Sequence, residues 1–202
     1  MANKSMKWLI PVIIVVVLVF SIFSWFTRSY NRMVTLDEGV KAAWSQVENV
    51  YQRRFDLIPN LVETVKGYAA QERETFTAVT EARARAGGVM NVSDEVLNNP
   101  ESFQRFQQAQ SELSGALQRL LVVTENYPEL KSNQNFLALQ DQLEGTENRI
   151  AVERRNFNET AREYNTYIRH FPRAFIANMS GFTQRGYFES SEGADTAPKV
   201  QF

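Results

Sequence analysis

The longest apolar stretch of the chain lies near its N-terminus. Residues 8–26 carry no charge, and only two serines among them are polar. As a helix rising roughly 1.5 Å per residue, this stretch covers about 28 Å, which is close to the hydrocarbon thickness of a bilayer. A tryptophan stands near each end, as is typical of membrane interfaces. The pattern predicts a transmembrane anchor over residues 1–27, and its marker residues are Trp8, Phe20, Trp25 and Phe26.

Two other interpretations of this stretch fit less well. A cleaved signal peptide would have a shorter apolar region, and residues 26–30 offer no cleavage site of small residues. A buried core helix would show a polar face. Basic residues flank the stretch on both sides, so the positive-inside rule gives a near tie. A short basic N-terminus in the cytoplasm is the commoner arrangement, which favours a body on the periplasmic side.

A helical pattern follows the anchor. Thr35 with a glutamate three residues later reads as a capping box. Apolar residues then recur in steps of three or four from Val40 to Val65. Pro59 interrupts this stripe, but the stripe stays in phase across it, which predicts a kinked continuous helix. We expect that helix to fade towards Ala86 and to stop at the glycine pair 87–88.

Two further long helices are predicted beyond a loop that ends at Asn99. Asn99 is suited to cap a helix with Pro100 in its first turn, and Pro128 closes this helix. The next helix, 132–171, has apolar residues spaced seven apart, which is typical of coiled-coil-like packing. These residues are Phe136, Leu143, Ile150, Phe157, Tyr164 and Phe171.

The C-terminal part of the pattern is weaker. A short amphipathic helix is expected to end near Gly181, with Phe175, Ile176, Met179 and Phe182 on its apolar side. Residues 183–202 are mostly polar and predict a flexible tail, with Tyr187-Phe188 and residues 200–202 as apolar exceptions suited to docking. Strand patterns are nearly absent. The fold class is therefore all-α: the anchor, an elongated body of long helices over 28–182, and the tail.

The amino-acid composition and charge exclude several classes of binding site and metal site. The 202 residues have a formal net charge of −1, which divides into +4 over residues 1–34 and −5 over the rest. This balance excludes a strongly basic nucleic-acid binder. The chain has no cysteine and one histidine, His170, so it has no thiolate or multi-histidine metal site. At a helix end, His170 suits a helix-dipole partner better than a catalytic base. We expect no enzyme activity, no cofactor and no metal.

Two groups of charged and polar residues are the candidate sites. The group around Pro59 is either a network that satisfies the backbone group freed at the kink or a partner surface. In the other group, Glu147 and Arg154 fall on the inner seam of the third long helix, where an unpaired charge would cost several kcal/mol. These charges either pair between helices and fix their register or line an oligomer. The candidates are Arg53, Arg54, Asp56, Asn60, Glu144, Glu147, Arg149, Arg154 and Arg155.

Several sequence segments resemble one known family. They include YNRMV at 30–34, AWSQV at 43–47, QRRFDLIPNLVETVKGYAAQ at 52–71, VTEARA at 79–84 and ENYPELKSNQNFLALQDQLEGTENRIAVER at 125–154, followed by Tyr164-Asn165 and Phe171-Pro172. Over about residues 28–202 the chain resembles the LemA family of bacterial membrane proteins. The resemblance implies an anchor in the bacterial inner membrane and an antiparallel bundle of the four-helix type. It implies no catalytic residues.

These observations lead to one main functional hypothesis. The chain is expected to be a single-pass, non-enzymatic scaffold or adaptor of the cell envelope that forms a homo-oligomer and has an envelope protein as a partner. One alternative is a regulatory or accessory subunit of a membrane enzyme or protease. Another is an envelope ligand sensor with a pocket between helices.

Overall fold

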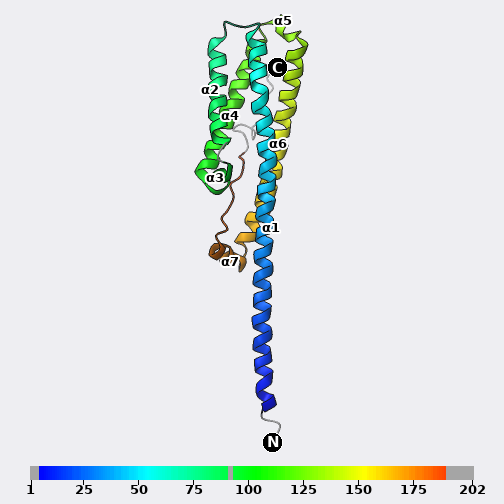
Figure 1. Ribbon diagram of the computed structural model, residues 1–202, viewed down its shortest axis with the longest axis vertical. Helices are drawn as coiled ribbons and strands as arrows, with labels where there is room; N and C mark the ends of the chain where they lie inside the picture. The colour runs from blue at the N-terminus through cyan, green and yellow to red at the C-terminus, as the bar shows by residue number, and fades with distance from the viewer. Residues whose placement is uncertain (1–4, 91–92, 190–202) are drawn as a thin grey trace, which may run out of the picture. The chain divides into compact units, whose positions relative to one another are not determined.

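The computed structural model describes residues 5–90 and 93–189, and within these ranges it is helical without strands (Figure 1). The helices are α1 (Ser5–Lys66), α2 (Arg73–Met90), α3 (Ser93–Asn98), α4 (Pro100–Thr124), α5 (Pro128–Lys131), α6 (Gln134–Arg169) and α7 (Arg173–Ser180). The predicted all-α class is confirmed.

The chain divides into two compact units. The first, here called the anchor unit, contains the residues up to Lys41 together with Arg162–Gln184. The second, here called the bundle unit, contains Ala42–Ala161 and the residues from Arg185 onward. Helices α1 and α6 contribute residues to both units.

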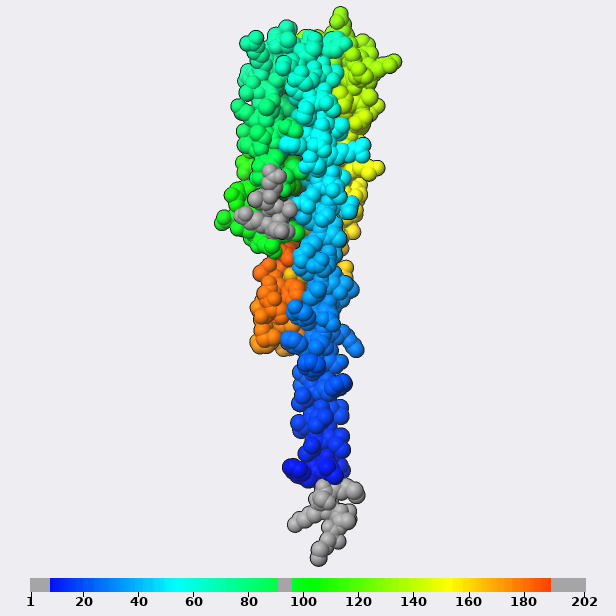
Figure 2. Space-filling view, viewed as in Figure 1, coloured from blue at the N-terminus to red at the C-terminus, as the bar shows by residue number. Residues whose placement is uncertain are grey.

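The N-terminal part of α1 exposes its apolar side chains. This is the one helix among the described residues that is long and apolar enough to cross a membrane, and none of its most apolar window is buried. Figure 2 shows its N-terminal end, in dark blue, with no other segment over it on the face in view. Trp8, Phe20 and Trp25 are exposed, and Phe26 is half-buried. Such exposure is unfavourable in water and fits a membrane protein.

The rest of the anchor unit packs the C-terminal end of α6 and α7 against α1. Arg32 Nη2 donates to Glu163 Oε1 over 2.8 Å, and the rings of Tyr30 and Phe182 lie 5.7 Å apart. The Tyr164 hydroxyl donates to the Thr183 carbonyl over 3.0 Å. The predicted short helix is confirmed as α7, which ends at Gly181 in the left-handed conformation with φ 78°. Its Ile176 and Ala177 are buried, whereas the predicted apolar residues Phe175 and Met179 are exposed.

Two predictions about the first long helix are wrong. Thr35 does not cap a helix, because α1 runs through it from Ser5 and its hydroxyl donates to the Asn31 carbonyl over 3.0 Å. The helix also does not continue to Ala86. It passes through Pro59, ends at Lys66, and a separate helix begins at Arg73 and runs past the glycine pair to Met90.

The connection between α1 and α2 contains a buried residue, and the chain reverses there. Ala69, in the connection between the two helices, is fully buried, and α2 then packs beside α1. Because apolar residues recur with the helical period on both sides of the connection, the stripe does not distinguish a reversal from a kink. At position 87 inside α2, a Cβ would lie 2.9 Å from Cε2 of the Phe55 ring. This close packing favours a glycine there.

The later helices follow the sequence more closely. The Asn99 side chain accepts hydrogen bonds from the backbone N–H groups of Glu101 and Ser102, which confirms the predicted cap of α4. The predicted loop before it is wrong in part, because α2 extends to Met90 and α3 occupies Ser93–Asn98. The heptad residues of α6 from Phe136 to Tyr164 are buried. Phe171 is 93% exposed, because α6 ends at Arg169 and the heptad pattern outlasts the helix.

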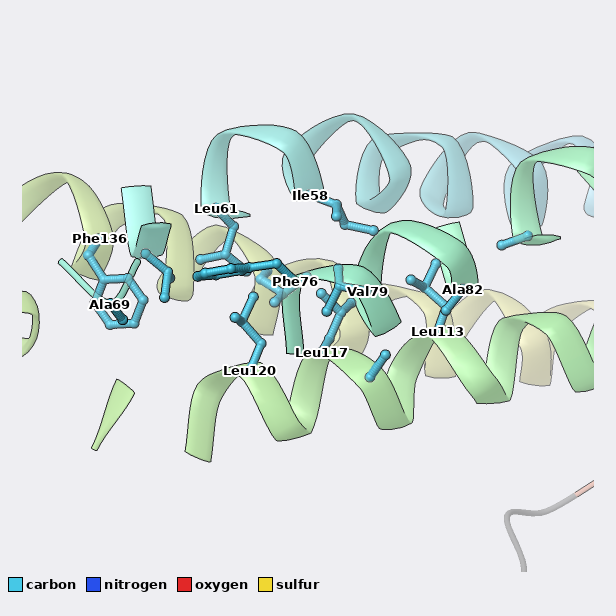
Figure 3. Packing of buried hydrophobic residues seen from close by; sticks show 14 of the residues in the cluster. Ile58, Leu61, Ala69, Phe76, Val79, Ala82, Leu113, Leu117, Leu120 and Phe136 are labelled. Atoms are coloured by element: carbon cyan, nitrogen blue, oxygen red, sulfur yellow. The ribbon is translucent and has the colours of Figure 1, made fainter. Parts of the chain in front are cut away.

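The bundle unit contains a four-helix core in which successive long helices run in opposite directions (Figure 1). Figure 3 shows side chains from α1, α2 and α4 pointing toward one another, with Phe136 from α6 beside them. We call this core the aliphatic-rich cluster. Its members are Ile58, Leu61, Val65, Ala69, Phe76, Val79, Ala82, Ala86, Leu113, Ala116, Leu117, Leu120, Leu130, Phe136 and Leu143.

A second group of buried side chains in the bundle unit is aromatic. Its rings lie with centroids between 5.0 and 6.4 Å apart, in tilted, stacked and edge-to-face arrangements that stabilise aromatic groups. We call it the aromatic cluster. Its members are Trp44, Tyr51, Phe103, Phe106, Phe157 and Phe188.

Candidate functional site

The candidate site is centred on Arg54, a charged residue on the buried face of α1. Helical spacing places it on the same face as Tyr51, three residues before it, and Ile58, four residues after it. The side chain is 1% exposed. A charge removed from water to this extent is stable only when its donors are satisfied by hydrogen bonds and an opposite charge.

The two Nη atoms of Arg54 find these partners on two other helices, whereas its buried Nε–H has no hydrogen-bond partner among the described residues. Its Nη1 donates to Glu147 Oε1 of α6 over 2.8 Å and to the Ser114 hydroxyl of α4 over 2.7 Å. Its Nη2 donates to the side-chain oxygen of Gln110, also on α4. The guanidinium lies 5.0 Å from the centroid of the Tyr51 ring. One side chain therefore connects three helices at a fixed register.

Tyr51 and Arg154 extend this network. Burial raises the pKa of the Tyr51 hydroxyl, and the positive charges of Arg154 and Arg54 oppose this shift. The Arg154 guanidinium lies 4.7 Å from the centroid of the Phe188 ring. Since the raised pKa keeps the phenol neutral at physiological pH, Tyr51 is a polar contact here and not an anionic one.

A groove of about 620 Å³ opens over this network, between α1, α4 and α6. Its walls are rich in amides and hydroxyls, which bind by hydrogen bonds, and they contain both signs of charge. The lining residues are Tyr51, Arg54, Gln104, Gln107, Gln108, Gln110, Ser111, Ser114, Glu147, Ile150, Arg154 and Glu189. Two smaller cavities of about 300 and 340 Å³ continue along α4 and α6. The geometry suits a polar ligand.

Comparison with known proteins assigns the chain to a family, and the match includes the groove. The LemA family model matches residues 43–202, about four-fifths of the chain, and all groove residues lie inside the match. The chain belongs to the LemA family. It is also similar to magnetosome protein MamQ of Magnetospirillum gryphiswaldense and to magnetosome protein MamQ 2 of Paramagnetospirillum magneticum. Each is 28% identical over 182 residues, which cover 83% of this chain and 67% of the relative.

The structure of this LemA-family chain brings together three of the nine residues selected from the sequence. Arg54, Glu147 and Arg154 line the groove. Glu144 is exposed and borders the adjoining 300 Å³ cavity. The remaining five are outside these cavities: Arg53, Asp56, Asn60, Arg149 and Arg155.

The backbone carbonyl freed by Pro59 is paired with a residue that the sequence did not identify. Proline has no N–H to donate to the carbonyl four residues earlier, which is that of Phe55. Arg83 of α2 donates its Nε–H to this oxygen over 3.2 Å and lies 3.7 Å from the centroid of the Phe55 ring. Asp56 instead accepts from Gln52 over 2.7 Å. The sequence identifies the freed carbonyl but not a donor on another helix.

Other site residues were also missed. Gln110 and Ser114 are ordinary polar residues of α4, and their role depends on which helix faces Arg54. The sequence marked Phe188 as an apolar residue suited to docking, but it did not identify its partner Asn158. In the part of the chain that the structure describes, no group of three His, Asp or Glu side chains is placed to hold a metal ion.

Proposed function

We propose that this LemA-family chain is a membrane-anchored, non-enzymatic scaffold or adaptor of the bacterial cell envelope that self-assembles through its helices. The observation that carries the proposal is the fully exposed apolar window of α1. The same helix supplies Tyr51 and Arg54 to the bundle unit. A helix that anchors the chain and also organises its core suits a protein that positions others at a membrane.

The groove supports binding in preference to catalysis. The Nη1 and Nη2 donors of Arg54 are engaged by Glu147, Ser114 and Gln110 of the same chain. Burial raises the pKa of the Tyr51 phenol in the groove, away from physiological pH. A general acid or base would need the opposite shift. The relatives are named as magnetosome proteins and not as enzymes.

The mass of the intact full-length particle in detergent tests this proposal. We expect a multiple of the 23.2 kDa chain after the detergent contribution is subtracted. A monomeric particle at every protein concentration would contradict the scaffold.

Protease digestion of spheroplasts tests the compartment. We propose that the bundle unit lies on the periplasmic side of the inner membrane, since a short basic N-terminus favours the cytoplasm. External protease should then degrade the bundle unit in intact spheroplasts. Complete protection, followed by digestion after lysis, would place the unit in the cytoplasm.

The accessory-subunit alternative is tested by affinity capture from membranes. The full-length chain and a chain lacking residues 183–202 are compared. Loss of a membrane enzyme or protease on truncation would favour this alternative, and an unchanged set of captured proteins would count against a role for the tail.

The 620 Å³ groove is a specific observation in favour of a ligand sensor. A ligand at one hundred times its Kd stabilises the protein by about 2.7 kcal/mol, so a thermal-shift screen of polar metabolites should detect it. Gln104→Ala changes the groove wall and should reduce such a shift, whereas Arg119→Ala lies outside the lining and should not. A screen without any shift would exclude the tested metabolites as ligands.

A further inference from the structure

The anchor unit exposes a second apolar surface besides the N-terminal window of α1. Phe175 on α7 is 73% exposed and Met179, one turn later on the same face, is 62% exposed. Ile176 and Ala177 are buried, so α7 packs by one side only. Phe171, one helical spacing before Phe175, is 93% exposed. We call Phe171, Phe175 and Met179 the α7 patch, and large apolar side chains exposed together in this way mark an interaction surface.

The start of the α7 patch lies level with the end of the apolar window of α1. In the anchor unit α6 runs antiparallel to α1 (Figure 1), and Arg32 of α1 contacts Glu163 of α6 over 2.8 Å. Arg169, where α6 ends, is six residues after Glu163, and Phe26 is six residues before Arg32. At roughly 1.5 Å per residue, both lie about 9 Å from the contact in the same direction. The chain therefore enters the patch at the level of Phe26, the last residue of the uncharged stretch.

Burial along α1 agrees with this level. The side chains of residues 8–23 are all exposed, whereas Phe26 is half-buried and Ser29 is buried. After α7 the chain returns to α1 at Phe182, whose ring centroid lies 5.7 Å from that of Tyr30. Helix α7 is therefore held beside the turns of α1 that follow the apolar window.

The charge around the α7 patch is positive. Residues 164–184 contain no aspartate or glutamate. Arg169 is exposed, and the Arg173 guanidinium lies 4.2 Å from the centroid of the Tyr167 ring. Arg28 of α1 is exposed near the same end of the apolar window. Arginine donors match the geometry of phosphate groups, so this end of the anchor unit suits anionic lipid headgroups.

We propose that the α7 patch is a second membrane contact, in which its three apolar side chains enter the interface of the bilayer beside α1 and the neighbouring arginines bind anionic headgroups. Helices that lie in an interface combine apolar and basic residues in this way. The patch adjoins the apolar window that anchors the chain, which favours lipid over a second protein as its partner. The proposal rests on the membrane anchor proposed above. Since interfacial contacts set the tilt of a membrane helix, the patch fixes the angle at which α1 leaves the bilayer.

Lipid quenching tests the second contact, because the natural chain has no cysteine and can be labelled at single positions. Full-length Phe175→Cys and Met179→Cys chains carry an environment-sensitive fluorophore and are reconstituted at low density in vesicles of phosphatidylcholine and phosphatidylglycerol. We expect emission at shorter wavelength and quenching by lipids with a nitroxide near the headgroup. Val152→Cys is an exposed position on α6, seventeen residues before Arg169 and thus about 26 Å from it along the helix, and should show neither change.

The contribution of charge is tested by lipid composition. Vesicles of phosphatidylcholine alone should quench the label at position 179 less than vesicles that also contain phosphatidylglycerol. Arg169→Gln should reduce this difference between the two kinds of vesicle. A difference unchanged by Arg169→Gln would overturn the role of this arginine in binding anionic headgroups.

A label in the apolar window of α1 separates failure of the second contact from failure of the anchor. Val16→Cys should be quenched by lipids with a nitroxide deep in the acyl chain. Quenching at position 16 with water-like emission at 175 and 179 would overturn the second contact alone. Short-wavelength emission at 175 and 179 without lipid quenching would show that protein covers the patch, which also overturns the proposal. Absence of quenching at position 16 would contradict the membrane anchor itself.

Discussion

The two hydrophobic groups of the bundle unit are built in different ways. Every member of the aliphatic-rich cluster belongs to a helix or to a short connection between helices, and four long helices supply most of it. The aromatic cluster is completed by Phe188, which belongs to no helix. The first cluster therefore forms with the bundle itself. The second has one member that can be withdrawn by releasing a short segment.

Arg54 lies between the two groups along α1. Tyr51 on one side belongs to the aromatic cluster, and Ile58 on the other belongs to the aliphatic-rich cluster. Apolar stripes alone leave the register of neighbouring helices poorly defined, whereas one buried polar contact is satisfied in a single register. A polar boundary around Arg54 thus separates the two clusters and aligns α1 with α4 and α6.

The largest expected effect comes from breaking this boundary. Glu147→Ala removes the carboxylate that pairs with the buried Arg54 guanidinium. A buried charge that loses its partner costs about 3–5 kcal/mol, and because Glu147 is itself 40% exposed, we expect the free energy of unfolding to fall by an amount near the lower end of this range. Urea denaturation of the full-length protein in detergent measures the change.

The matched control for this prediction is Glu144→Ala, one helical turn earlier on α6 and exposed. It should change the free energy of unfolding by less than about 0.5 kcal/mol. Equal effects at the two positions would show that the contact of Glu147 with Arg54 adds no more to the free energy of unfolding than an exposed glutamate does.

A second pair of substitutions compares the clusters directly. Leu120→Ala opens a cavity in the aliphatic-rich cluster and should cost about 3 kcal/mol. Phe188→Ala removes a larger side chain. Its effect on global unfolding cannot exceed the free energy with which the segment 185–189 docks, because this segment can leave while the bundle stays folded.

Hydrogen exchange resolves these two cases. Phe188→Ala should raise amide exchange at 185–189 and around Asn158 while α2 stays protected. Leu120→Ala should lower protection throughout the four long helices. Global loss of protection in Phe188→Ala would mean that the two clusters form one cooperative unit.

Sequence periodicity predicted part of the aliphatic-rich cluster and little of the site. Residues such as Ile58, Val65 and Phe136 repeat at helical spacing, and each stripe is visible without knowledge of its neighbours. The Asn99 cap and the Gly181 helix end are likewise local signals. The reversal between α1 and α2 was missed because the buried Ala69 lies in phase with both helices' apolar pattern.

The site depends on which helices face each other, and this information is not local. The sequence identified Glu147 and Arg154 on an inner seam and Arg54 beside Pro59, but not that Arg54 and Glu147 meet. Gln110, Arg83 and Asn158 are polar residues whose partners lie 56, 28 and 30 positions away. A stripe predicts burial, whereas a polar contact between elements requires the fold.

A smaller effect is expected at the start of α4, the helix that supplies both Phe103 and Leu120. Asn99→Ala removes the side chain that accepts from two backbone N–H groups of the first turn. The loss should be about 1 kcal/mol. Asn99→Ser retains an accepting oxygen and should recover most of the loss in the same urea titration. Full retention of stability in Asn99→Ala would show that neighbouring water replaces the cap.

Two glycine substitutions compare the packing of a helix with that of the non-helical segment 185–189. Gly145 lies inside α6, and a Cβ added there would meet no atom within 4 Å, so Gly145→Ala should stabilise the helix by about 0.5–1 kcal/mol. Gly186→Ala places its Cβ 3.1 Å from the Phe103 ring and should weaken docking of the segment 185–189. The expected result is opposite signs, read as a rise in thermal midpoint for the first and faster exchange at 185–189 for the second. The same sign for both would contradict the close packing of Gly186.

The smallest effect is a dependence on alkaline pH at Tyr51, the residue where the aromatic cluster meets the polar boundary. Burial raises the pKa of its hydroxyl above the ordinary value near 10. The unfolded chain therefore loses this proton first as pH rises. The contribution of Tyr51 to stability is fully present below about pH 10 and is lost as pH rises through the folded pKa. Tyr51→Phe should flatten the fall in the free energy of unfolding above pH 10, whereas Tyr68→Phe, at an exposed tyrosine, should leave it as in the natural chain. An identical alkaline profile in Tyr51→Phe would place the pH-sensitive group outside this boundary.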